Sequence, residues 1–379
     1  MLGAMVAYLD HAATTPMRPE AVAAMLPFLT EHFGNPSGSH AVARRAKAAL
    51  EDARDLVASC LGCRPGEVVF TGGGTEADNL AVSGSLARRV GGRAVCSAIE
   101  HHAVLHSVLS SAGGATFGVT ADGIVDLDAL SAVLSSDVSV VSVMLANNEV
   151  GTIQPLASVV EVVRRLAPGA VVHTDAVQAF PWVDVAPSAS VADLVAVSAH
   201  KFGGPKGVGA LVVRGSASVA PILHGGGQEQ DRRSGTHNLA GIVGMAAAMS
   251  ATVASRAVEV DRVRGLRDRL ADGLLSAVPG AVETGVRSAK IAGNCHVLVP
   301  GVESEALLFL LDEAGVCASA GSACASGALE PSHVLSAMGV APDLARGVLR
   351  LSLGPASTDD DVDLALKVVP EAVARLRSS

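Results

Sequence analysis

Short apolar runs alternate with longer stretches of helical periodicity through the first two-thirds of the chain. Because the runs are rich in valine and nearly continuous, they predict buried strands. The predicted strands are residues 68–70, 93–99, 115–119, 138–145, 170–174, 194–199 and 209–213. Helical patterns separate most of them, for example at 75–90, 126–134 and 155–167. This alternation is typical of an α/β fold with a mainly parallel, seven-stranded sheet flanked by helices.

The pattern changes after a long predicted helix at 241–277. Strands predicted at 296–299, 316–318 and 347–353 alternate with helices at 303–314 and 359–377. This mixture indicates a smaller α+β domain. We therefore expect a large domain over residues 14–250 and a small domain made of residues 1–13 and 251–379.

Composition narrows the function classes. The chain has 379 residues, 49% hydrophobic, with a formal net charge of −9. Its length suits about two domains, and an acidic chain is a poor candidate for direct nucleic-acid binding. The N-terminus lacks the features of a secretion signal, and the apolar residues 241–255 are small enough for a packed helix. We expect a cytoplasmic protein that does not enter a membrane.

The six cysteines are expected to be free thiols, because no secretion signal precedes them. Cys60 and Cys63 form a lone C-x-x-C pair, and a structural zinc site needs four ligands. We therefore expect no metal site there, and the pair is interpreted as part of an ordinary helix end.

Polar groups gather where the predicted strands end. Residues "TGGGTEADN" follow the first strand, and a glycine loop at a helix start favours phosphate. A capping box from Thr75 to Asp78 is an equally ordinary interpretation. The next polar groups, "EHHAV" and "ANNEVG", also fit satisfied strand-end residues and turns. Asp175 and Gln178 in "HTDAVQ" stand three residues apart, and a buried carboxylate needs a positive partner.

One ligand accounts for all these groups together. Pyridoxal phosphate (PLP) has a phosphate, a ring nitrogen that favours a carboxylate, and an aldehyde that reacts with a lysine. The chain offers a glycine loop, His101, Asn148, Asp175 and Lys201 in that order. Lys201 in "SAHKFGGPKG" then ends a buried strand because it must meet the aldehyde. A solvated strand end is the alternative for Lys201.

At this point the chain resembles the cysteine desulfurases, PLP enzymes of fold type I in the class-V aminotransferase group. The resemblance runs from "YLDHAATTP" to "LRLSLG", over about the whole chain. Its motifs are "GGGTEADNLA", "EHHAVL", "NNEVGT", "HTDAVQ", "SAHKFGGPKGVGAL", "HGGGQEQDRRSGT" and "GSACASG…EPSHVL".

The resemblance implies a role for each matching residue. Gly74, Thr75, Ser198 and His200 would hold the phosphate. His101 would stack on the ring and help to move protons, and Asn148 and Gln178 would bond the phenolic oxygen side. Asp175 would pair with the ring nitrogen, and Lys201 would bind the aldehyde covalently. Thr236 would reach the phosphate of a neighbouring subunit, which implies a homodimer. Arg350 would bind the substrate carboxylate with a bidentate fork, and Asn148 would also bind the substrate.

The resemblance also implies that Cys324 carries the sulfur. Residues 320–334 are rich in glycine, alanine and serine, which suits an exposed loop. The family often has Ser or Thr after this cysteine, where this chain has Ala325. Cys324 would attack the sulfur of L-cysteine, release L-alanine and keep a persulfide. A sulfur-acceptor protein would then serve iron–sulfur assembly, tRNA thiolation or DNA phosphorothioation.

Two rival functions remain open at this stage. A selenocysteine lyase or another class-V aminotransferase-like enzyme would share the fold and the cofactor. A non-catalytic interaction protein would keep only the fold. The intact Lys201 and Cys324 motifs favour the desulfurase.

Overall fold

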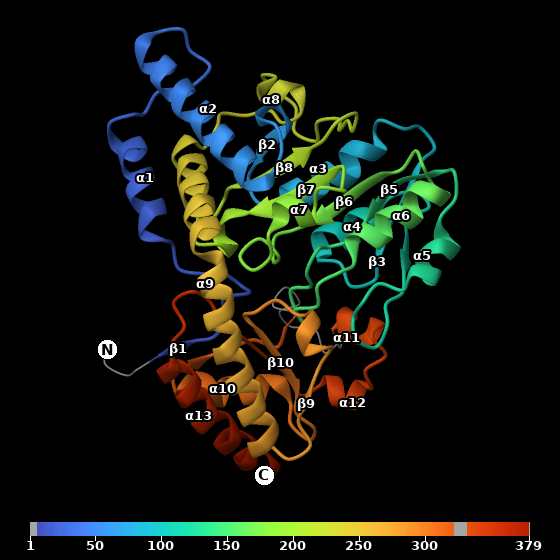
Figure 1. Cartoon of the computed structure of the whole chain (residues 1–379), viewed down its shortest axis with the longest axis vertical. Helices are drawn as coiled ribbons and strands as arrows, with labels where there is room; N and C mark the ends of the chain where they lie inside the picture. The colour runs from blue at the N-terminus through green and yellow to red at the C-terminus, as the bar shows by residue number, and fades with distance from the viewer. Residues whose placement is uncertain (1–5, 322–331, 379) are drawn as a thin grey trace.

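A seven-stranded sheet forms the centre of the larger part of the molecule (Figure 1). The computed structural model describes residues 6–321 and 332–378. The strand order is β2-β8-β7-β6-β5-β3-β4. Only β8 is reversed, because it pairs antiparallel with both of its neighbours. The predicted mainly parallel sheet is confirmed, with strands β2 (Val68–Thr71), β3 (Arg93–Ser97), β4 (Ala115–Phe117), β5 (Val138–Ser142), β6 (Val171–Asp175), β7 (Leu194–Ser198) and β8 (Gly209–Val213).

Helices cover both faces of this sheet, which explains the nearly continuous apolar strands. In β7, Val195 and Val197 belong to one core cluster, and Leu194 and Ala196 to another on the opposite face. The first face is covered by α2 (Ala41–Leu61), α6 (Leu156–Leu166), α7 (Val185–Ser188) and the start of α9 (Leu239–Ala277). The second face is covered by α3 (Gly74–Leu86) and α4 (His102–Leu109).

A smaller antiparallel sheet has the order β12-β10-β9. It packs with the end of α9 and two helices around a second apolar core. The strand β1 pairs in parallel with β11, so the start of the chain joins this C-terminal part. The elements here are β1 (Ala7–Tyr8), β9 (Val282–Glu283), β10 (Asn294–Leu298), β11 (Val316–Cys317), β12 (Val348–Ser352), α10 (Ser304–Glu313) and α13 (Asp359–Arg377).

The remaining elements are short or peripheral. They are α1 (Pro19–Thr30), α5 (Leu127–Val133), α8 (Gln228–Asp231), α11 (His333–Ala337), α12 (Pro342–Ala345), and the 3-10 turns η1 (Pro65–Glu67), η2 (Ala199–Lys201) and η3 (Arg287–Ala289).

Helix α9 runs past both sheets (Figure 1). Its 39 residues correspond to about 58 Å at the usual rise per residue. The domain boundary expected at residue 250 falls inside this helix, so that division stays a prediction. Among the described residues, α9 alone is long and apolar enough to cross a membrane, a test that core helices also pass. Ile242, Met245 and Met249 lie in the main core, as expected for a packed helix.

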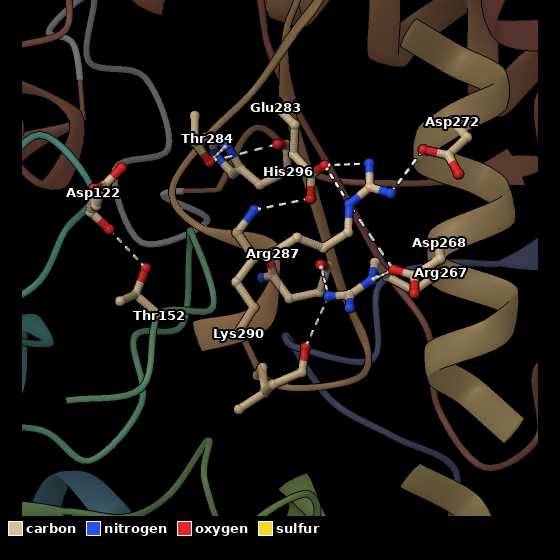
Figure 2. A network of polar contacts seen from close by, with 12 residues as sticks. Asp122, Thr152, Arg267, Asp268, Asp272, Glu283, Thr284, Arg287, Lys290 and His296 are labelled. Atoms are coloured by element: carbon tan, nitrogen blue, oxygen red, sulfur yellow. Dashed lines mark hydrogen bonds and ion pairs between the residues drawn. The ribbon is translucent and has the colours of Figure 1, made fainter. Parts of the chain in front are cut away.

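A network of charged side chains ties the second half of α9 to the smaller sheet (Figure 2). Arg287 donates to Asp272 of α9 and to Glu283 of β9. Lys290, whose side chain is completely buried, donates to Glu283 at 3.2 Å. The segment after Lys290 contacts the part of the molecule that contains the seven-stranded sheet, because the Asn294 side-chain amide donates to the Glu149 carbonyl at 2.8 Å. The network thus holds the segment that supports the loop around residue 149.

The Glu283→Ala variant should lower the free energy of unfolding by about 3 kcal/mol, because it leaves the buried Lys290 ammonium without its carboxylate. Glu303→Ala is the matched control. Its partner Arg346 lies 3.8 Å away and both side chains are largely exposed, so its cost should stay below about 1 kcal/mol. Denaturant unfolding followed by circular dichroism measures both. Equal stability losses in the two variants would contradict the importance of this network.

Candidate active site

A cavity of about 330 Å³ opens at the carboxyl ends of the central strands. In parallel sheets this edge is the usual place for a ligand. Ten of the predicted site residues line it: Gly74, Thr75, His101, Asn148, Asp175, Gln178, Ser198, His200, Lys201 and Arg350. The chain therefore brings together groups that lie up to 276 residues apart, from Gly74 to Arg350.

One end of the cavity is suited to an anion. Helix α3 begins here at Gly74, after Gly73 in a conformation with φ 144° that disfavours side chains. A Cβ on Gly74 would lie 3.0 Å from Val177 and 3.2 Å from Ser198, so the backbone can approach only as glycine. The helix start offers free N–H groups, to which Thr75 and Ser198 add hydroxyls. A phosphate would be held at this end.

Asp175 supplies a buried negative charge. It ends β6 and is 5% exposed, and its Oδ1 accepts a hydrogen bond from the Val177 N–H at 2.8 Å. Burial raises its pKa to about 6, although the Val177 N–H and the charge of Lys201 act in the opposite direction. A cationic group in the cavity would stabilise the ionised form of Asp175.

Lys201 closes the cavity against the N-terminal segment. Strand β7 ends at Ser198, and the turn η2 then carries Lys201. The Lys201 ammonium donates to the carbonyls of Ala12 and Ala13 at 2.6 and 2.8 Å. Gln178 donates to the same Ala12 carbonyl at 2.8 Å. The first residues of the chain thus set the position of this lysine.

His101 is held as a neutral imidazole. Its Nδ1 accepts from the Ala103 N–H at 3.1 Å and caps α4, so the proton of the neutral ring sits on Nε2. Burial, with a smaller contribution from the charge of Lys201, lowers its pKa to about 4. His101 therefore presents a hydrogen-bond donor to the cavity at neutral pH.

Arg350 is already bound on two sides. Its Nη1 donates to the carbonyls of Asn148 and Gly321, at 2.9 and 3.0 Å. Its Nη2 donates to Asp10 at 2.9 Å. In the part of the chain that the structure describes, the buried Nε and one hydrogen on Nη2 have no hydrogen-bond partner. A carboxylate that binds Arg350 as a fork would use the Nε–Nη2 edge.

Two predicted site residues remain, Thr236 and Cys324. Thr236 is exposed and does not line this cavity. Cys324 lies outside the described residues.

Cys60 lies in the last turn of α2, and Cys63 follows that helix. Burial raises the pKa of both thiols, and that of Cys63 reaches about 11. Within residues 6–321 and 332–378, no group of three or more side chains is arranged to hold a metal ion.

The sequence did not reveal several residues of the site. His102, Glu149 and His333 also line the cavity, and the His102 and His333 rings lie 4.7 Å apart. The capping-box interpretation of Asp78 is wrong, because Gly73 caps α3 and the Asp78 side chain is buried below the cavity. Two features of the sequence could have indicated these residues. His102 is the second histidine of "EHHAV", and Asp78 is an acidic residue shortly after the glycine loop.

Comparisons with known proteins identify the family of this chain. The family model "Aminotransferase class-V" matches residues 7–365. An IscS-like cysteine desulfurase of Mycobacterium tuberculosis is 48% identical over 98% of this chain and 97% of its own length. A solved NifS-like protein has a TM-score of 0.91 and 34% identity, over 98% of this chain and 100% of that one. A structure of SspA in complex with cysteine has a TM-score of 0.79 and 30% identity, over 93% and 99%.

Proposed function

The chain belongs to the class-V aminotransferase family and is a PLP-dependent cysteine desulfurase, and from this premise we propose how its residues divide the reaction. One observation supports these roles. The start of a helix suited to an anion, a buried carboxylate and a lysine line the same cavity. L-Cysteine is the substrate, and L-alanine and transferable sulfur are the products.

The residues present fit PLP. The α3 start with Thr75, Ser198 and His200 would hold the phosphate, and Asp175 would face the protonated ring nitrogen. Asn148 and Gln178 would bond the phenolic oxygen side. Burial raises the pKa of the Asp175 carboxyl to about 6, and a protonated ring nitrogen would stabilise its ionised form. When bound, PLP supplies an aldehyde for covalent linkage and a ring that accepts electrons.

Lys201 and His101 would transfer protons to and from the substrate. Lys201 Nζ would hold the aldehyde in the resting enzyme, and as a free amine it would accept the proton from the substrate Cα. The His101 ring would stack on the cofactor ring, and its Nε2–H would donate a hydrogen bond into the cavity. Arg350 would hold the substrate carboxylate at its Nε–Nη2 edge, oriented by Asp10 and Asn148.

Cys324 would receive the sulfur. Its thiolate attacks the sulfur of the bound substrate, the substrate C–S bond breaks, and the electron pair stays on the substrate carbon, which is then protonated. L-Alanine leaves and Cys324 keeps a persulfide. We propose that an acceptor protein takes this sulfur next.

The assembly is proposed to be a homodimer in the cytoplasm. Thr236 is exposed and outside its own cavity, as expected for a residue that serves a neighbouring subunit. Val22, Leu26, Leu29 and Phe33 of α1 and the segment after it form an exposed apolar strip that a second subunit could cover. The net charge of −9 supports the absence of a direct nucleic-acid ligand.

Lys201→Ala should abolish alanine formation and the visible absorption band of the lysine-linked cofactor, although PLP can still bind through its phosphate. Lys206→Ala, an exposed lysine of the same motif, should keep both. Absorption spectra of the purified proteins and an alanine assay decide the question. A linked-cofactor band that survives in Lys201→Ala and disappears in Lys206→Ala would assign the chemistry to the other lysine.

Asp175→Ala should lower the rate of alanine formation at saturating cysteine by roughly 100-fold or more, because the ring nitrogen loses an oriented charge. Asp184→Ala, an exposed carboxylate that pairs with Arg256, is the control and should remain close to the parent. A near-parental rate in Asp175→Ala would remove this residue from the proposed mechanism.

Cys324→Ser should bind PLP and L-cysteine normally, as judged by absorption, but should not form alanine, because a hydroxyl is a poor nucleophile toward sulfur. In the parent protein, cysteine without reductant should add one sulfur to the peptide that contains Cys324. Cys317→Ser, at the end of β11, should behave like the parent. Peptide mass spectrometry that finds the added sulfur on another cysteine would contradict the proposed acceptor.

A further inference from the structure

A group of buried polar side chains lies between α3 and the central sheet, next to Asp175. Asp78 comes from α3, and His173 comes from β6, two residues before Asp175 and therefore on the same face of the sheet. Glu100 follows β3. Asp78 is 1% exposed, and His173 and Glu100 are completely buried. None of these three has a part in the mechanism proposed above.

The contacts link the group into one network. His173 Nδ1 lies 2.8 Å from the Ser142 hydroxyl. Its Nε2 lies 3.6 Å from Asp78 Oδ1, and neither atom has a hydrogen-bond partner among the described residues. Glu100 Oε1 accepts from the Ser97 hydroxyl at 2.7 Å and from the Met144 N–H at 2.8 Å. Its Oε2 has no described partner.

The charges in this network cannot all be present together. Three carboxyl groups, Asp78, Glu100 and Asp175, influence one another in a buried region, and isolated buried charges are costly. The neighbouring cation Lys201 acts on Asp175. The other titratable groups nearby offer no compensation, because Glu76 pairs with Arg233 and Cys96 is a buried thiol.

The pKa values follow from this crowding. Burial raises the pKa of Asp78 well above its usual range, with the charges of Asp175 and Glu100 adding to the effect. Burial also raises the pKa of Glu100 to about 8 and lowers that of His173 to about 3. A neutral His173 provides no positive charge for Asp78. The tautomer of His173 sets which of its two ring nitrogens carries the proton, and an Nε2 without a proton would accept a hydrogen bond from a protonated Asp78.

We propose that Asp78 and Glu100 each hold a proton at neutral pH, and that Asp78 is a positioning residue which leaves Asp175 as the ionised carboxylate of the network. The inference rests on the proposed role of Asp175 toward PLP and adds the residues that set its charge. The acid proton of Asp78 and the imidazole of His173 keep the negative charge at the strand end, where the ring nitrogen is expected.

Infrared spectroscopy of the holoenzyme tests the location of the protons directly. The C=O stretching band of protonated carboxyl groups should be present at neutral pH. It should lose one component in Asp78→Asn and another in Glu100→Gln, and none in Asp175→Asn. Loss of a component in Asp175→Asn, with none lost in Asp78→Asn, would place the proton on Asp175 and overturn the proposal.

The rate at which the holoenzyme loses PLP tests the positioning role. Asp78→Asn replaces a neutral acid by a neutral amide of the same shape, so PLP loss should stay within about threefold of the parent. Asp78→Ala removes a buried hydrogen-bonding group and should speed PLP loss roughly tenfold. An Asp78→Asn holoenzyme that loses PLP as fast as Asp78→Ala would contradict the positioning role, and unchanged carboxyl bands in Asp78→Asn would contradict the proton on Asp78.

Glu100 gives a pH-dependent readout. Its folded-state pKa of about 8 lies above the usual value of 4.5, so the unfolded chain binds fewer protons than the folded chain between these values. The stability of the parent holoenzyme should therefore fall as the pH rises from about 5 to 8. Glu100→Gln should remove part of this fall, so that its melting temperature gains on the parent with rising pH. If the melting temperatures of Glu100→Gln and the parent change with pH by the same amount, Glu100 is not protonated in the parent at neutral pH.

These outcomes separate the inference from the function. A holoenzyme of Asp175→Asn with parental activity would remove the proposed role of Asp175, whereas the infrared assignment of protons to Asp78 and Glu100 would stand. Conversely, Asp175→Asn can lose activity while the parent shows no band of protonated carboxyl groups. That result would support the role of Asp175 and refute the proposed protons on Asp78 and Glu100.

Discussion

Desolvation of charge at the carboxyl ends of the parallel strands is the constraint on which the site depends. Asp175 is buried there, and its carboxylate accepts a hydrogen bond from the Val177 N–H. A carboxylate in this position is tolerated when a cation is near, and the chain places Lys201 at the end of the adjacent strand. The same low polarity that makes the carboxylate costly also strengthens its effect on a bound cation. The cost of burying Asp175 and its proposed role toward a cofactor have one physical origin.

The sequence predicted the strands well because their signal is local. Valine-rich runs with helices between them identify a parallel sheet, and residues that follow such strands must share one edge, which placed His101, Asp175 and Lys201 together. Specific roles for those residues came from the resemblance of whole motifs to a family. Single residues such as Thr75 kept an ordinary alternative until the fold excluded the capping box.

The remaining site residues were beyond local reasoning because their partners are distant in the chain. Arg350 is oriented by Asp10, 340 residues away, and Lys201 is held by carbonyls of Ala12 and Ala13. Asp78 looks like an ordinary helix residue until His173 is found beside it. Hydrogen bonds and ion pairs of this kind have no periodicity, so no pattern in the sequence reports them. They depend on how two sheets and a long helix are placed relative to one another.

The pairing of β1 with β11 has a consequence for how the protein is made. The ribosome synthesises residues 7–10 about 300 residues before their partners Val316, Cys317 and Ser352. The central sheet can form on the growing chain, because its strands end at Val213. The wall that fixes Lys201 must wait for the C-terminal strands. The central sheet can therefore be complete in the nascent polypeptide before the candidate active-site cavity is, because the cavity also needs Arg350.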